Sequence, residues 1–170
     1  IILVSGYQSQ KIDDYSQELA IIYSISFEIV FNPFWDHCIV LGSFYMSLEI
    51  IKDDFIFLHA DTLSSKEVVN GLIASASDVC LAVDLKLCGE EEMKVWLENN
   101  KVKRITKHDI GYKADGEFVG IAKFSRSMIA YFREKSQAIF KLGVQPFLLA
   151  EIFKMLLLSF LIPSLLKIKK

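Results

Sequence analysis

Two aspartates follow apolar runs that have the character of buried strands. Asp61 comes after the run 55–58 in the segment DDFIFLHADTL, and Asp84 ends the run DVCLAVD. In open parallel sheets, ligands bind beyond the carboxyl ends of the strands, and the helices that begin there favour phosphate. A divalent cation removes the repulsion between a carboxylate and a phosphate, and Mg²⁺ suits this role because it keeps water and phosphate oxygens as ligands. The pattern therefore points to a metal-bound nucleotide.

A second interpretation of the same segment needs no metal. Asp61 or Thr62 would then cap the helix that follows the strand. The pattern alone weighs these two interpretations about equally. Other catalytic signatures are absent from the sequence, which has no Walker A loop, no G-x-G-x-x-G and no G-x-S-x-G. The three histidines also lack the spacing of metal ligands: they are His37, His59 and His108.

Composition narrows the class of protein. The 170 residues are 52% hydrophobic and 24% charged, which predicts a globular domain with a sizeable core. The net charge of −2 gives no basic field for nucleic acid polymers. Cys38, Cys80 and Cys88 are odd in number and form no C-x-x-C pair, so we expect reduced thiols in a cytoplasmic protein and no zinc site.

Strand and helix patterns alternate along the first half of the chain. Strands are expected at 1–7, 27–32, 54–60 and 78–84, and helices at 9–20, 41–52 and 66–76, with Ser9 and Ser64 or Ser65 as N-caps. This order predicts an α/β fold with a mainly parallel sheet. Short alternating runs follow at 93–98, 99–107 and 116–125, the first two as a hairpin, before a helix over 125–142. We interpret these runs as a β-rich insertion.

Several segments resemble nucleotidyltransferases that make nucleoside-diphosphate sugars and CDP-choline-type head groups. DDFIFLHADTL is similar to that family's D-F-I-L-x-N-G-D-T-L, AVDLKLCGEEEMKV to V-D-R-K-x-x-x-D-x-D-D-M-K-V, and KADGEFVGIAKFS to D-G-E-x-I-G-I-x-K-F. ILVSGYQSQKI resembles I-V-x-G-Y-x-x-x-x-I, and NPFWDHCIVLGSFYMSLE resembles N-P-x-Y-x-x-x-N-x-x-x-S-L-x-x-A. The segments occur in the family's order from Ile2 to about Ser125, and they are nearest to phosphocholine or phosphonate cytidylyltransferases.

The resemblance implies a Rossmann-like, three-layer nucleotidyltransferase domain of the GT-A type. It also implies transfer of a nucleotidyl group, most simply cytidylyl from CTP, to a phosphorylated or phosphonate acceptor with release of pyrophosphate. Asp61, at the Asp of the family's G-D, would hold Mg²⁺, although His59 and Ala60 replace the usual Asn and Gly. Asp61 and Lys86 would be the catalytic residues. The expected substrate-binding residues are Ser43, Asp84, Lys107 and Glu117, with Glu117 facing a cationic group of the acceptor.

Two parts of the family pattern have no counterpart in the sequence. These are the N-terminal Gly-rich loop that wraps the triphosphate and a second metal-binding Asp near the C-terminal end. We therefore expect 1–143 to be a partial nucleotidyltransferase domain that lacks its first strand and does not turn over nucleotide alone. Residues 144–170 form an apolar tail, with 147–162 expected to be helical and membrane association a weaker option. The alternative is a non-catalytic α/β module with an apolar interaction tail.

Overall fold

The computed structural model describes residues 1–135 and residue 138. The described residues form two compact units. One unit comprises Ile1–Ile51 with the described residues from Tyr131 onward, and the other comprises Lys52–Ala130. The predicted boundary at residue 143 and the predicted helix over 147–162 lie outside the described residues, so both stay predictions. Within the described part of the chain, no helix is long and apolar enough to cross a membrane.

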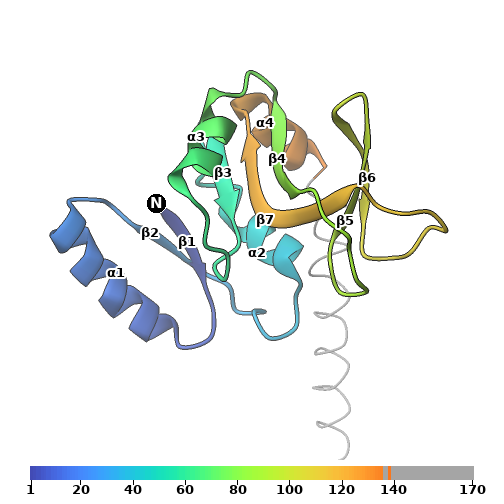
Figure 1. Ribbon diagram of the computed structural model, residues 1–170. Helices are drawn as coiled ribbons and strands as arrows, with labels where there is room; N and C mark the ends of the chain where they lie inside the picture. Colours follow the sequence, from blue (N-terminus) through green and yellow to red (C-terminus); the bar gives the residue numbers. More distant parts are fainter. Residues whose placement is uncertain (136–137, 139–170) are drawn as a thin grey trace, which may run out of the picture. The chain divides into compact units, whose positions relative to one another are not determined.

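The first unit is built on a parallel pair of strands (Figure 1). β1 (Ile2–Ser5) pairs with β2 (Glu28–Phe31) in the register that places Ile2 opposite Glu28 and Ser5 opposite Phe31. The connection between them is α1 (Ser9–Tyr23), as parallel pairing requires a crossover. α2 (Val40–Ser47) follows β2 and packs against β1. The strand–helix–strand order predicted for this region is confirmed.

The ends of α1 differ from the sequence prediction. The helix begins at Ser9, but the residue before it, Gln8, adopts a left-handed conformation and no side-chain cap forms. The expected Ser9 cap is therefore wrong, because Ser9 already lies inside the helix. At the other end, Ser24 is left-handed and its backbone N–H bonds the carbonyl of Ala20, which is a common way to close a helix.

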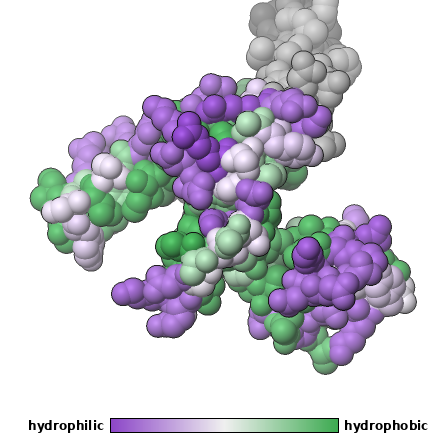
Figure 2. All heavy atoms as spheres, turned by 90° about the horizontal axis from the view of Figure 1, so that it is seen from above, coloured by the Kyte–Doolittle hydropathy of each residue, from purple (hydrophilic) through white to green (hydrophobic). Residues whose placement is uncertain are grey.

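Much of α1 is apolar and exposed. Tyr15 is 64% exposed and Ile22 is 58% exposed, with Ile12 and Leu19 on the same stripe of the helix. Figure 2 shows apolar surface at the left of the view, where α1 lies in Figure 1. The buried side of the helix is instead marked by Ser16, whose hydroxyl donates to the carbonyl of Ile12.

The second unit contains a mixed sheet in which β7 (Gly116–Phe124) is central (Figure 1). β3 (Phe55–Leu58) and β4 (Val79–Asp84) both pair antiparallel with β7, so they run in the same direction on either side of it. The α/β class is confirmed. The parallel neighbours expected for β3 and β4 are replaced by a strand from later in the chain, and among the described strands only β1 and β2 pair in parallel.

A hairpin extends this sheet. β5 (Lys94–Glu98) pairs with β7 and with β6 (Lys101–Thr106), and a two-residue turn joins β5 to β6. Asn99 and Asn100 in this turn have φ values of 51° and 61°, as the turn type favoured in tight hairpins requires. The hairpin predicted from the short alternating runs is therefore confirmed.

The most buried side chains of the second unit lie on β5 and β7. Val95 and Ile121 are fully buried, and Trp96 and Ala122 are nearly so. α3 (Lys66–Ala74) packs on β4 and β7 through buried Leu72. α4 (Arg126–Glu134) begins directly after β7 and buries Ile129. β3 was expected to be a buried strand, but its first three residues are only partly buried and Leu58 is 52% exposed. Among the described strands, β3 pairs only with β7.

Candidate functional site

Asp61 lies in a tight turn that follows β3. The backbone N–H of Thr62 donates to the carbonyl of His59 at 3.1 Å, which makes Asp61 the third residue of a four-residue turn. The N–H of His59 donates to the carbonyl of Gly120 on β7 at 2.9 Å, so the β3–β7 ladder continues into the turn. The hydroxyl of Thr62 adds a bond to the carbonyl of Val119 at 3.3 Å.

The helix-cap interpretation of Asp61 is wrong. α3 begins at Lys66, and the residue at its N-cap position is Ser65, so Asp61 lies outside the capping turn. Ser65 was one of the two predicted caps, although its side chain makes no capping hydrogen bond. Asp61 is exposed, and no hydrogen bond or ion pair to its carboxylate occurs within residues 1–135 and 138. Its carboxylate is therefore available to a ligand.

A second group of charged residues lies where β4 meets the start of β7. Asp84 is paired in register with Glu117, and Lys86 Nζ lies 2.7 Å from Glu117 Oε2. Gly116 makes this approach possible, since a Cβ there would lie 2.3 Å from the carbonyl oxygen of Asp84. The structure thus brings together Asp84, Lys86 and Glu117, three of the residues expected at the site.

Electrostatics at this group favour the charged form of the lysine. The hydrogen bond to Glu117 raises the pKa of Lys86 above its ordinary value of 10.5, and the negative charges of Glu117, Asp84 and Glu92 add to that effect. The Lys86 side chain is 42% exposed, whereas that of Glu117 is 23% exposed. Lys86 is therefore held by an ion pair while its side chain stays partly exposed.

An open pocket adjoins this ion pair. Its lining consists of Leu85, Lys86, Leu87, Lys113, Ala114 and Asp115, which come from the segments after β4 and before β7. Its charged lining residues are two lysines and one aspartate. Asp61 and Asp84 do not line this pocket, and β7 separates the strands that carry them. This pocket therefore does not bring the two aspartates together.

Lys107 is separate from the Lys86–Glu117 pair. Its Nζ lies 3.9 Å from the carboxylate of Glu91, and both side chains are exposed. Its carbonyl accepts a hydrogen bond at 3.0 Å from Lys94, which is buried and also donates to the carbonyl of Glu90. Lys94 thus ties the loop before β5 to the end of β6, which is a structural role that the sequence did not reveal.

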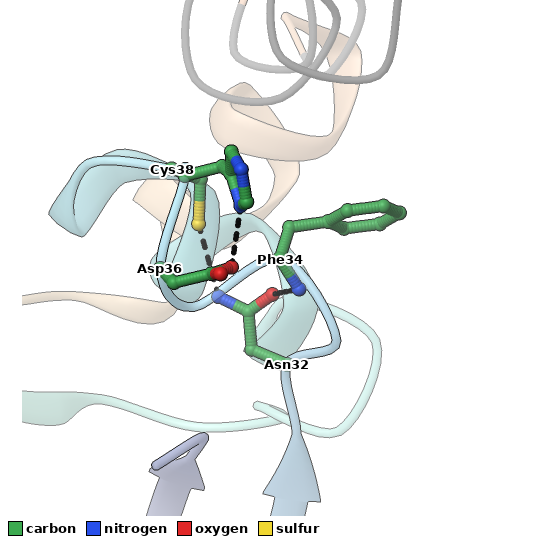
Figure 3. A network of polar contacts seen from close by, with 5 residues as sticks. Asn32, Phe34, Asp36 and Cys38 are labelled. Atoms are coloured by element: carbon green, nitrogen blue, oxygen red, sulfur yellow. Dashed lines mark hydrogen bonds and ion pairs between the residues drawn. The ribbon is translucent and has the colours of Figure 1, made fainter. Parts of the chain in front are cut away.

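Ser43 belongs to the first unit, where it takes part in a buried network. Asn32 is 1% exposed, and its side-chain amide donates to Ser43 Oγ at 3.1 Å and to Cys38 Sγ at 3.0 Å. Its carbonyl oxygen accepts from the N–H of Phe34 at 2.9 Å, and Figure 3 shows how this amide lies inside the loop that runs on to Cys38. The Ser43 hydroxyl therefore helps to fix the loop after β2.

An exposed aromatic pair lies after β1 and β2. The rings of Tyr7 and Trp35 have centroids 5.3 Å apart, and their residues are 66% and 45% exposed. Gly6 allows Trp35 to come close, since a Cβ at Gly6 would lie 2.2 Å from the Cβ of Trp35. The sequence gives no direct signal of this pair, since the Asn-Pro dipeptide after β2 and the glycine after β1 are typical of turns in general.

The side chains near Asp61 determine which metal ion could bind there. The described residues contain no cluster of three or more His, Cys, Asp or Glu side chains that would enclose a metal ion. Asp61 is instead a single accessible carboxylate on a fixed turn. A lone carboxylate suits Mg²⁺ shared with phosphate oxygens and water, and it does not suit a cation that needs a full set of protein ligands. Asp61 can supply one ligand to the expected ion, and the metal site itself stays a prediction.

Comparisons with known proteins support the fold. No protein-family model matches the sequence, and no curated protein sequence matches it either. Among solved structures, the inositol-1-phosphate CTP transferase from T. maritima is 18% identical, with a TM-score of 0.60 over 76% of this chain and 52% of that one. A putative glucose-1-phosphate thymidylyltransferase from Bacillus anthracis, in complex with a sucrose, is 12% identical, with a TM-score of 0.62 over 79% of this chain and 55% of that one.

These likenesses span only part of the matched proteins. The chain corresponds to about half the length of each solved structure. The Rossmann-like α/β fold expected from the sequence is confirmed, and the chain has the fold of these nucleotidyltransferases.

Proposed function

We propose that this chain carries part of the active site of a nucleotidyltransferase. The reaction transfers a cytidylyl group from CTP to a phosphorylated or phosphonate acceptor. An oxygen of the acceptor attacks the α-phosphorus, the bond from that phosphorus to the β-phosphate oxygen breaks, and pyrophosphate leaves. Such transfers depend on positioning and charge neutralisation rather than on a covalent enzyme intermediate.

The observation that carries the proposal is the Asp61 carboxylate. It is exposed, makes no hydrogen bond or ion pair among the described residues, and follows a sheet strand in a turn tied to the neighbouring strand. Asp61 would hold Mg²⁺, which supplies neutralisation of phosphate charge when bound. The likeness to two solved nucleotidyltransferases, in fold alone, supports this assignment.

Lys86 is the proposed phosphate contact of the acceptor. An ammonium group has three hydrogen-bond donors, and Glu117 accepts only one of them at 2.7 Å. The remaining donors are available beside the open pocket that Lys86 and Lys113 line. Glu117 and Asp84 would keep Lys86 charged and in place, and a cationic acceptor group that approached Glu117 would compete with Lys86 for it.

Ser43 and Lys107 have weaker support. The Ser43 hydroxyl already accepts a hydrogen bond from Asn32, which leaves its own O–H to donate to a substrate. Lys107 is exposed, and its only described ion pair is the long contact with Glu91. We propose both as substrate-binding residues with auxiliary roles.

Nucleotide binding is the first test, because the chain corresponds to about half of each matched structure. Calorimetric titration of the full 170-residue chain with CTP should show binding that depends on Mg²⁺ and is lost in Asp61→Asn. Asp53→Asn is the matched control, since Asp53 is an exposed aspartate just before β3, at the other end of that strand. The control should bind like the unchanged chain.

Turnover is the second test. Pyrophosphate release would be followed with CTP, Mg²⁺ and either phosphocholine or a phosphonate. Because 1–143 is expected not to turn over nucleotide alone, no release is expected from this chain. Release that requires Asp61 and Lys86 would support the proposed reaction and would overturn the expectation that the chain is inactive alone. CTP binding that is equal in Asp61→Asn and Asp53→Asn would overturn the metal role of Asp61, and with it this proposal.

A further inference from the structure

The turn that carries Asp61 is attached to β7 at a glycine with an unusual backbone. Gly120 has a φ of +83°, in the region that L-residues with side chains rarely adopt. It lies inside β7, opposite the end of β3, where the carbonyl of Gly120 accepts the N–H of His59. A glycine in a strand interior often marks a bulge or a close approach of other atoms.

Side-chain atoms of two other residues lie close to Gly120. A Cβ on Gly120 would lie 2.8 Å from Nδ1 of His59 and 3.0 Å from Oγ1 of Thr62. Both contacts belong to the first and last residues of the turn. Any side chain at Gly120 would therefore push directly on the two ends of the segment that presents Asp61.

Two further contacts keep the turn against β7. The Thr62 hydroxyl donates to the carbonyl of Val119, the residue before Gly120. The His59 ring meets Phe57 at a centroid distance of 5.2 Å and Phe118 at 6.1 Å, in both cases edge to face. Such contacts restrict the ring without using the Asp61 side chain, so the turn is ordered while its carboxylate stays exposed.

We propose that Gly120 and Thr62 are positioning residues for Asp61. The missing side chain of Gly120 and the Thr62 hydroxyl fix the His59–Thr62 turn on β7, and this presents the Asp61 carboxylate to a divalent cation bound with a nucleotide. The inference rests on the proposed function, because it assumes that Asp61 is the metal ligand. It goes beyond that function by assigning the geometry of the ligand to two residues that do not touch the metal.

The test measures metal affinity separately from stability. Mn²⁺ serves as the probe in the presence of CTP, and its binding to the full chain is followed by the relaxation of water protons. Thr62→Val removes the hydroxyl with little change in shape, and Thr62→Ser restores it. Thr106→Val is the matched control, since it removes a threonine hydroxyl from β6, outside the Asp61 turn.

We expect these variants to differ in their affinity for Mn²⁺. Thr62→Val should weaken Mn²⁺ binding by about threefold to tenfold, the range that follows from the loss of one hydrogen bond. Thr62→Ser should bind like the unchanged chain, and Thr106→Val should bind normally. Gly120→Ala, which keeps the Thr62 hydroxyl but places a Cβ against it, should weaken binding at least as much and serves as the deciding variant if Thr62→Val does not fold.

The variant Asp61→Asn distinguishes a failure of the proposed function from a failure of the positioning roles of Gly120 and Thr62. If Asp61→Asn abolishes Mn²⁺ binding but Thr62→Val and Gly120→Ala bind normally, the positioning roles are overturned and the proposed function stands. If Asp61→Asn binds Mn²⁺ normally, the proposed function fails and the positioning roles fail with it. If thermal stability falls in Thr62→Val but not in Thr62→Ser while both variants bind Mn²⁺ normally, the hydroxyl is structural only and the inference is wrong.

Discussion

Nζ of Lys86 lies 2.7 Å from Oε2 of Glu117, and this ion pair joins the segment after β4 to the start of β7. The pair sits beside Asp84, which is in register with Glu117, so one positive charge faces two negative ones. Two of these three residues, Asp84 and Lys86, belong to one sequence segment, and the third lies far along the chain. Their association therefore depends on the central position of β7.

Removal of the Glu117 charge should lower the pKa of Lys86. The pKa of Lys86 is raised above 10.5, chiefly by its hydrogen bond to Glu117, so Glu117→Gln should bring it back toward the ordinary value. Stability contributed by this pair is fully present below 10.5 and is lost as pH rises through the raised pKa. NMR titration of the Lys86 side chain in alkaline solution measures the change.

The control for this titration is Glu91→Gln. Glu91 is a nearby acidic residue whose described ion pair is with Lys107, and it does not contribute to the raised pKa of Lys86. Glu91→Gln should leave the titration of Lys86 unchanged. Equal shifts in the two variants would show that general negative charge, rather than the contact with Glu117, sets the pKa.

Asp78 should make the stability of the fold sensitive to acid. The hydroxyls of Ser125 and Ser127 both donate to its carboxylate, and they hold its pKa below 3.8. A carboxylate with a lowered pKa contributes stability above its unfolded value and loses it as pH falls through the folded value. The stability difference between the unchanged chain and Asp78→Asn should therefore be full at neutral pH and shrink below 3.8.

Urea unfolding across the acid range checks this expectation. The double variant Ser125→Ala with Ser127→Ala removes the donors and should behave like Asp78→Asn. Ser77→Ala is the control, because it removes a neighbouring hydroxyl that makes no described bond to Asp78. A difference that stays constant with pH would mean that the Asp78 carboxylate titrates normally in the fold.

Local pattern predicted most of the elements. The alternation from β1 to β4 follows from apolar runs, turn residues and helical periodicity, all of which act over short distances. The β5–β6 hairpin was predictable because Asn99 and Asn100 adopt positive φ more readily than most residues. Element ends were less predictable, as shown by Ser9, which lies inside α1 rather than at its cap.

Strand order was not predictable from the same signals. The run that forms β7 mixes apolar and polar residues, and nothing in its pattern predicts that it lies between β3 and β4. The position of β7 depends on which strand edges are free when the sheet assembles, and this is decided by long-range contacts rather than by local sequence. The role of Gly120 depends on this strand order, because His59 and Thr62 are its neighbours only once β3 pairs with β7.

Asn32 should be among the residues whose loss most destabilises the first unit. It is 1% exposed, and its side chain contacts Ser43, Cys38 and the N–H of Phe34. Asn32→Ala removes these bonds and leaves their buried partners unsatisfied, at a cost of about 2–4 kcal/mol in the free energy of unfolding. Asn32→Asp keeps the shape but loses both amide donors, so it should also destabilise the fold.

The matched control is Asn70→Ala, in the exposed part of α3, where alanine favours the helix and the free energy of unfolding should not fall. Urea unfolding with a probe in the first unit, such as the fluorescence of Trp35 in a Trp96→Phe background, compares the variants. Because Asn32 fixes the loop from Phe34 to Cys38, its loss should also make the Trp35 ring more mobile, which fluorescence anisotropy detects. If Asn32→Ala and Asn70→Ala have the same free energy of unfolding, the loop after β2 is held by other contacts.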